Sequence, residues 1–188
     1  MNYTEGIEYK QENFTTKPLE VGEYENCVFI SCNFEFSDLS NRKFVECEFL
    51  ECNLSNCKLN NTYLQTVKFD ACKMIGLQFD ACSDFGLSLE FGNCLLDHSS
   101  FYQKKVINTH FFECKLLEVD FSESDLTQAT FNECDLTRTI FANANLEKAD
   151  FRTASNYSID LNKNKVKGAQ FSLHGTPGLL GKYGIKIS

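Results

Sequence analysis

Apolar residues recur at every fifth position along most of the chain. In the stretch FNECDLTRTIFANANLEKADF, Phe or Leu stands at positions 131, 136, 141, 146 and 151. An α-helix repeats its buried face every 3.6 residues and a flat strand every second residue, so neither keeps these positions on one side. A five-residue period instead indicates short extended segments that are separated by corners.

Four such segments would close a square coil of about 20 residues, so that position i lies over position i+20 and successive coils pair as parallel strands. Stacked coils would bury a continuous core that no single repeat could form alone. Two runs keep this phase, and Phe14 and Leu19 extend the first run weakly towards the start. Their centres are residues 24, 29, 34, 39, 44, 49, 54, 59, 64, 69, 74 and 79, and then 96, 101, 106, 111, 116, 121, 126, 131, 136, 141, 146 and 151.

Two surplus residues separate the runs, because Phe79 and Leu96 are 17 positions apart instead of 15. Residues 80–95 must therefore form a bulge, a small loop or a kink. Phe85 and Phe91 could be centres with two one-residue bulges, or Leu89 could be a centre with one larger insertion. Asp84 would point inward if the segment keeps its phase.

The position two before each centre is expected to point inward and to be small, because two side chains share each side of a narrow interior. Cysteine, alanine, serine or threonine occupies it at residues 27, 32, 47, 52, 57, 62, 72, 94, 99, 109, 114, 124, 129, 134, 139, 144 and 149. Arg42 and Lys104 break this rule. Since an unpaired buried cation is very costly, we expect both side chains to swing outward.

Phenylalanine alternates with leucine or valine among the centres from residue 101 to residue 151. Residues ten apart lie on opposite sides of a four-sided coil, and residues twenty apart stack. The alternation therefore predicts two stacked columns, residues 101, 121 and 141 and residues 111, 131 and 151. Offset stacking would add roughly 0.5–1.5 kcal/mol per pair.

The quintets CDLTR, ANLEK, ADFRT and CNLSN resemble the signature of the pentapeptide-repeat proteins, and the resemblance covers about residues 24–171. It implies an all-β fold, a right-handed quadrilateral β-helix, a handedness that parallel crossovers also prefer. The tail SLHGTPGLLGKYGIKIS resembles the end of the Qnr-type quinolone-resistance proteins, where a helix with a Leu pair precedes a final strand. We expect a short helix near 177–183 and a strand at 184–187.

These patterns divide the chain into three parts. Residues 1–23 are expected to form an N-terminal cap and first irregular coil through Ile7, Phe14 and Leu19, residues 24–171 the β-helix with its register break at 80–95, and residues 172–188 a cap or dimerisation tail. An open last coil leaves unpaired strand edges. By resemblance to the Qnr-type proteins, we expect a tail-to-tail homodimer. Its contacts would come from Leu179, Leu180, Tyr183, Ile185 and Ile187.

Little in the sequence indicates catalysis. Nine of the ten cysteines fall on the small inward position and no C-x-x-C occurs, so we interpret them as reduced core thiols and not as a zinc site or a disulfide framework. His98, His110 and His174 lie in different quintets, without a nucleophile motif or a Gly-rich phosphate loop nearby. The expectation is a protein with no catalytic residue, no cofactor and no metal.

The charge distribution bears on the partner. Residues 1–156 carry a net charge of −12 and residues 157–188 carry +4. An acidic shaft argues against direct nucleic-acid binding, which needs a basic face. The sequence also contains no signal peptide and no membrane span, which predicts a cytoplasmic protein without a membrane contact.

Two functions remain. The first is a non-catalytic scaffold that binds a partner protein of unknown identity. The second, implied by the resemblance, is a DNA-mimic regulator or protector of a type II topoisomerase, DNA gyrase or topoisomerase IV, because a negative rod would be steered to a basic DNA groove. An uninterrupted acidic strip of Glu113, Glu133 and Asp150, with Asp120 and Glu123 on the opposite side, would favour the DNA mimic, whereas scattered acids would favour the scaffold.

Overall fold

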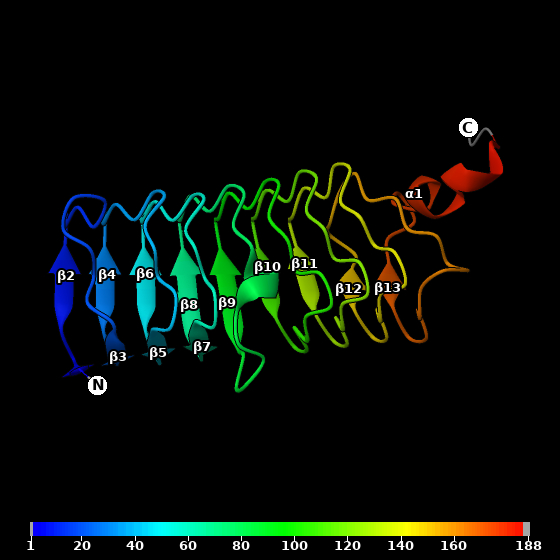
Figure 1. Ribbon diagram of the computed structural model, residues 1–188. Helices are drawn as coiled ribbons and strands as arrows, with labels where there is room; N and C mark the ends of the chain where they lie inside the picture. Colours follow the sequence, from blue (N-terminus) through cyan, green and yellow to red (C-terminus); the bar gives the residue numbers. More distant parts are fainter. Residues whose placement is uncertain (1, 186–188) are drawn as a thin grey trace.

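The chain is a parallel β-solenoid of about eight turns, a right-handed quadrilateral β-helix, with one short C-terminal helix (Figure 1). The computed structural model describes residues 2–185. Residues 2–23 form the first coil, with turns and bends at residues 14–17, and in it Phe14 and Leu19 are buried but Ile7 is 45% exposed. The N-terminal segment is therefore the first layer of the stack, and Ile7 does not contribute to the core.

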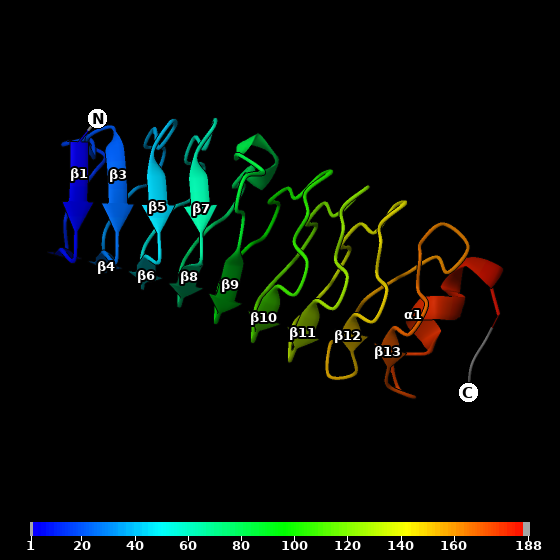
Figure 2. The same ribbon diagram turned by 90° about the horizontal axis from the view of Figure 1, so that it is seen from below.

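Two parallel sheets line the coil (Figure 2). The nine-stranded sheet contains β2 (Glu8–Lys10), β4 (Val28–Ile30), β6 (Glu48–Leu50), β8 (Val67–Asp70), β9 (Leu89–Gly92), β10 (His110–Phe112), β11 (Thr130–Asn132), β12 (Asp150–Phe151) and β13 (Gln170–Phe171). The four-stranded sheet contains β1 (Asn2–Glu5), β3 (Gly22–Glu25), β5 (Lys43–Val45) and β7 (Tyr63–Gln65). The remaining sides are connected by isolated bridges, such as Ser100 with Asp120. Partners are 20 residues apart in both sheets except between β8 and β9, as the period predicts.

Most corners of the coil are made by a residue in the left-handed conformation. Positive φ angles of 50–60° recur every five residues, for example at Glu113, Glu118 and Glu123. Asn, Glu and Gln occupy most of these corners. A left-handed residue turns the chain at the corner, and this is how a quintet ends and the next side begins.

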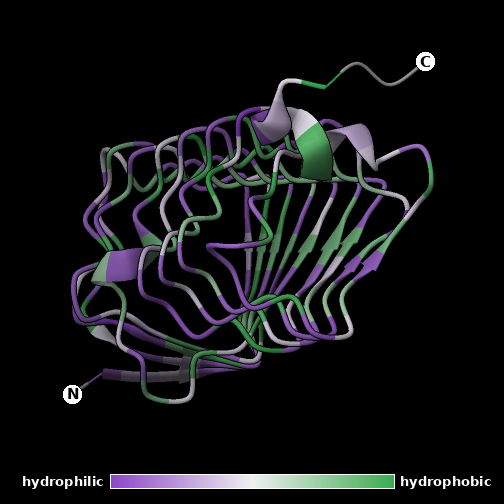
Figure 3. Ribbon diagram, turned by 90° about the vertical axis from the view of Figure 1, so that its right-hand side faces the viewer, coloured by the Kyte–Doolittle hydropathy of each residue, from purple (hydrophilic) through white to green (hydrophobic). Residues whose placement is uncertain are grey.

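Phenylalanine rings stack along the core as the alternation predicts. Phe101 stacks on Phe121 with ring centroids 4.9 Å apart, and Phe111 stacks on Phe131 at 5.0 Å. Rings from opposite sides meet edge-on, as Phe111 and Phe121 do at 5.9 Å. Seen from the C-terminal end, the coils enclose one continuous interior (Figure 3).

The small inward residues also satisfy backbone carbonyl groups. The Cys47 thiol donates to the Tyr24 carbonyl oxygen at 3.3 Å, and the Thr62 hydroxyl donates to the Leu39 carbonyl oxygen at 2.8 Å. Burial raises the pKa of the Cys47 and Cys57 thiols to about 12, so both remain protonated donors. This role explains why Cys and Thr recur where size alone would allow alanine.

Arg42 and Lys104 point inward and are buried, so the expectation that both swing outward is wrong. Arg42 occupies the same inward position as Thr62 and uses it in the same way. Its Nε and one terminal nitrogen donate to the Leu19 carbonyl oxygen, and the other donates to the Ser40 carbonyl oxygen at 3.0 Å. Carbonyl oxygens thus replace the water that the buried guanidinium loses.

Lys104 is held by the irregular segment. Its ammonium group donates to the Cys82 carbonyl oxygen at 2.6 Å and to the Asp84 carboxylate at 2.7 Å. The Asp84 side chain is 73% exposed, so Asp84 lies at the surface and its carboxylate pairs with the buried Lys104 cation. These two contacts connect the coil that contains Lys104 to residues 82–84 of the previous coil.

The two surplus residues form one small loop at 84–87. Before it Ser83 donates to Thr62 with the usual spacing, and after it Val67 pairs with Leu89, 22 residues later. Phe91 is the buried centre and stacks on Phe69 at 5.4 Å. Leu89 takes the inward position before it, whereas Phe85 is 76% exposed and is not a centre. The segment therefore has one larger insertion, as in the second expected arrangement, but its centre is Phe91, as in the first.

The C-terminal end of the stack is covered by α1 (Pro177–Leu180), which continues as the 3-10 turn η2 (Gly181–Tyr183). Leu179 is buried, and the Gly178 carbonyl oxygen accepts a hydrogen bond from the Ile159 amide at 3.0 Å. The predicted helix is therefore present. Gly184 and Ile185 are not in a strand, and the rest of the expected strand, Ile187 included, lies outside the described residues.

Candidate interaction surfaces

The outward side of the nine-stranded sheet is an acidic surface, which we call the long face. It consists of the outward side chains of β2, β4, β6 and β8–β13 and of the corners that follow them. Its acids are Glu8, Glu48, Glu51, Asp70, Glu90, Glu113, Glu133 and Asp150, and its lysines and arginines are Lys10, Lys68 and Arg152. The acids clearly outnumber these bases. The side would attract a basic partner at low salt.

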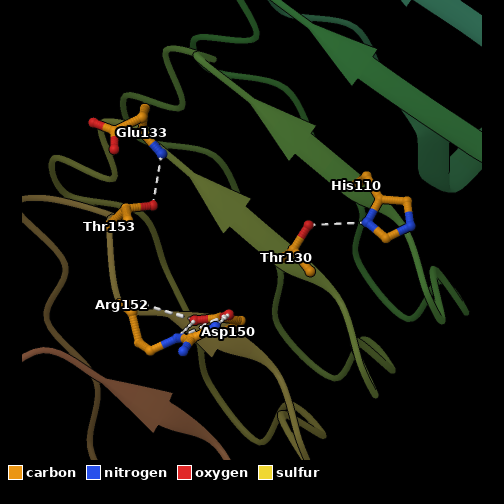
Figure 4. A network of polar contacts seen from close by, with 6 residues as sticks. All are labelled: His110, Thr130, Glu133, Asp150, Arg152 and Thr153. Atoms are coloured by element: carbon orange, nitrogen blue, oxygen red, sulfur yellow. Dashed lines mark hydrogen bonds and ion pairs between the residues drawn. The ribbon is translucent and has the colours of Figure 1, made fainter.

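The three acids predicted for one side of the coil do lie on the long face, and Figure 4 shows two of them, Glu133 and Asp150. Glu113 and Glu133 occupy equivalent exposed corners of successive coils, and the Glu133 amide donates to Thr153 Oγ1 at 3.0 Å. Asp150 is paired with Arg152, at 2.7 Å between Oδ2 and the guanidinium nitrogen. This hydrogen bond lowers the pKa of Asp150, and the pair neutralises the end of the row.

The other two predicted acids lie across the core from the long face, on the side whose Phe121 meets Phe111 edge-on. Asp120 accepts a hydrogen bond from the Ser122 amide at 2.8 Å. Its neighbours above and below, Ser100 and Ile140, carry no charge. Glu123 accepts from the Gln103 side chain at 2.8 Å. These acids form a short pair between neutral residues.

Opposite charges stack on one another along several columns. Lys43 lies 2.7 Å from Glu23 one coil earlier, and Glu118 bridges His98 at 3.1 Å and Arg138 at 3.0 Å. On the long face, Lys68 pairs in register between Glu48 and Glu90. Such cross-strand pairs stabilise a sheet modestly, and they interrupt the negative potential along the shaft.

A shallow notch of about 300 Å³ interrupts the long face at Gly92. Leu50 and Phe112 flank it, and Glu48, Glu90 and His110 lie around its edge. A Cβ atom at Gly92 would lie 2.7 Å from the Asp70 carboxylate oxygen, so the missing side chain helps to form the notch. The apolar period does not reveal this notch, because a glycine at an outward position leaves the period unchanged.

The residues expected to form a dimer contact are not equally available. Leu179 is buried in its own chain and Leu180 is partly buried, whereas Tyr183 and Ile185 are more than half exposed. Leu173, which was not among the residues expected from the sequence, is 86% exposed. Leu173, Tyr183 and Ile185 are therefore the apolar residues of the described C-terminal segment that a second copy could cover.

The cysteines and two of the histidines are held in contacts within the fold. Across residues 2–185, no three His, Cys, Asp or Glu residues gather in a way that could hold a metal ion. His98 pairs with Glu118, His110 is hydrogen-bonded to Thr130 at 3.0 Å, and the ten cysteines are free and buried. None of the helices within the described residues has the length and apolar character needed to cross a membrane.

Comparison with known proteins agrees with the fold. A family model for pentapeptide repeats matches residues 47–83, and a family model for a pentapeptide repeat region matches residues 84–171. Two trypsin-treated variants of QnrB1, a plasmid-mediated fluoroquinolone resistance protein, are similar in structure. One has a TM-score of 0.66 at 15% identity over 100% of both chains, and the other 0.65 at 17% over 99% of this chain and 97% of that chain. No curated protein sequence matches the chain.

Proposed function

The chain belongs to the pentapeptide-repeat family, and on that premise we propose that it is a non-catalytic cytoplasmic scaffold whose long face binds a basic surface of a partner protein. The acidic excess of the long face, eight acids against three lysines and arginines, carries this proposal. The rigid sheet presents Glu113 and Glu133 at fixed spacing. Binding therefore costs little conformational entropy beyond that of these two side chains. The proposal includes no direct contact with nucleic acid.

Charge reversal on two different sides tests the scaffold. The variant Glu113→Lys with Glu133→Lys should lose a partner that the wild type captures from a lysate of its source organism, identified by mass spectrometry. The matched variant Glu46→Lys with Glu147→Lys makes the same charge change away from the long face and should keep the partner. Loss of the partner from both variants, or from neither, contradicts the proposal.

A second candidate function is a DNA-mimic regulator or protector of DNA gyrase or topoisomerase IV. The acids on two opposite sides of the shaft, Glu113 and Glu133 against Asp120 and Glu123, favour it because a duplex also carries two negative rows. The related fold of a fluoroquinolone resistance protein makes the same enzyme class the natural candidate. The neutralised Asp150 and the stacked opposite charges make this the weaker of the two proposals.

Self-association belongs to the same proposal. We expect two copies to join tail to tail through the exposed residues Leu173, Tyr183 and Ile185, which flank α1. Replacing Tyr183 and Ile185 by glutamate should convert a dimer into a monomer in sedimentation, and deleting residues 174–188 should do the same. An unchanged mass of the double variant contradicts the dimer through this tail, and a wild-type monomer does so as well.

A further inference from the structure

Phe36 occupies a corner of the coil that suits it poorly. Its φ is 56°, and within residues 2–185 no other Phe, Tyr, Ile, Leu or Val has a positive φ. The side chain is also 70% exposed. An asparagine would make the same corner with less strain and without exposing a phenyl ring. A residue that is strained and unfavourably exposed at once points to a role outside the fold.

The ring borders a groove of about 700 Å³ between the first two coils. Val21, which is 54% exposed, and Pro18 continue the apolar part of its wall. The backbone beneath Phe36 is fixed, because its amide donates to the Ser55 carbonyl oxygen of the next coil at 3.0 Å. The groove therefore presents a preformed apolar wall to solvent.

The carboxylates that line this groove outnumber its exposed cations, and Lys58 of the next coil pairs in register with Asp38. Glu35 and Asp38 line it, and the hydrogen bond from Ser40 lowers the pKa of Asp38 so that its carboxylate stays ionised at neutral pH. Arg42 also borders the groove, but its guanidinium is 6% exposed and all three of its nitrogens donate to backbone carbonyl oxygens. The guanidinium is thus held within the fold, whereas the two carboxylates border the groove.

We propose that the groove beside Phe36 binds an extended segment of a partner protein in which an apolar side chain is flanked by lysine or arginine. The apolar side chain would pack against Phe36 and Val21, and the flanking cations would pair with Glu35 and Asp38. This site lies on the corners after β4, apart from the acids Glu113 and Glu133 of the long face. It would let the protein hold a second partner.

Two labelled pentapeptides test the chemistry directly. Fluorescein-labelled Gly-Lys-Phe-Lys-Gly should bind the wild-type protein, with amide shifts in ¹⁵N NMR spectra confined to residues 15–21 and 33–42. The peptide Gly-Glu-Phe-Glu-Gly, which keeps the ring and reverses the charges, should not bind. Equal binding of the two peptides, or shifts centred elsewhere on the chain, overturns the proposal.

Variants at the corner separate the binding role from stability. Phe36→Asn should raise the melting temperature by about 2–4 °C because it relieves the backbone strain. The same variant should weaken the basic peptide roughly tenfold, since the ring contact is lost. Thr66→Asn is the matched control, because Thr66 has a similar φ of 55° at a corner away from the groove. It should relieve the backbone strain there and leave the peptide affinity unchanged.

Val21→Ser provides an independent check, because it shortens the apolar wall without touching a left-handed corner. It should weaken the basic peptide while leaving the melting temperature close to that of the wild type. Unchanged binding in both Phe36→Asn and Val21→Ser contradicts the proposal. Loss of self-association in Phe36→Asn during sedimentation would assign the groove to a second copy of the chain, and that result also contradicts it.

Discussion

The two sheets respond differently to the same two surplus residues. The nine-stranded sheet passes the loop at 84–87 without a gap, because β8 and β9 pair with a spacing of 22 residues. The four-stranded sheet ends at β7, and beyond the loop its side of the coil has isolated bridges, such as Lys105 with Asp125. Behind the continuous sheet, the buried centres next to the loop are all aromatic, namely Phe69, Phe91 and Phe111. Stacked rings therefore hold the register, and the insertion is confined to a side with aliphatic centres.

Breaking the aromatic column at the loop should have the largest effect. Phe91 stacks between Phe69 and Phe111 and is almost fully buried, so Phe91→Ala should lower the free energy of unfolding by about 3–5 kcal/mol. Urea unfolding followed by circular dichroism measures this loss. Phe112→Ala, which removes a 46% exposed ring from β10, should change stability by about 0.5 kcal/mol or less. Similar losses in the two variants would show that the column does not hold the register.

Removing the cation beneath the loop should have an intermediate effect. Lys104→Met leaves the buried Cys82 carbonyl oxygen without its donor and should cost about 1–3 kcal/mol. Limited proteolysis should also cut the loop at 84–87 faster in this variant, because Asp84 loses its partner. Asp84→Asn keeps the carbonyl contact and should cost about 1 kcal/mol or less, since the acid is mostly exposed. An equal cost for the two substitutions would exclude the carbonyl contact as the main stabilising interaction.

Acidification should produce the smallest effect. Hydrogen bonds from Arg152 and from Ser40 lower the pKa of Asp150 and Asp38 below 3.8. Stability that these folded-state carboxylates contribute is present above that value and is lost as the pH falls through their folded pKa. The urea midpoint should therefore drop as the pH is lowered from about 3.8 through the folded pKa of these two carboxyl groups, and it should drop less in Asp150→Asn. An identical pH dependence in this variant would contradict the assigned role of Asp150.

Period and spacing were sufficient to predict the coil, the stacked columns of Phe121 and Phe131, and the inward position of the cysteines. They failed for Arg42 and Lys104, because a rule based on size ignores the carbonyl groups that an inward donor can satisfy. The loop could not be resolved in advance, since Phe85, Leu89 and Phe91 are all apolar and only stacking on Phe69 selects among them.

The candidate surfaces were predicted less well than the core. Glu113 and Glu133 do share a face, but the neutralising pair of Asp150 with Arg152 depends on side-chain geometry that spacing does not specify. The groove beside Phe36 carried one signal that the pattern could have revealed. Phe36 stands where the other quintets have mostly Asn, Glu, Gln or small residues, and a comparison of the corner positions alone would have singled it out.

Gyrase supercoiling, measured with the purified protein titrated in, tests most directly whether the long face is a scaffold or a duplex-like rod. The assay should be run with and without a fluoroquinolone and at two salt concentrations. Because opposite charges interrupt the acidic columns, the account predicts no inhibition and no drug protection at tens of micromolar protein. Inhibition or protection that fades as the salt concentration rises would contradict the scaffold and assign a type II topoisomerase as the partner.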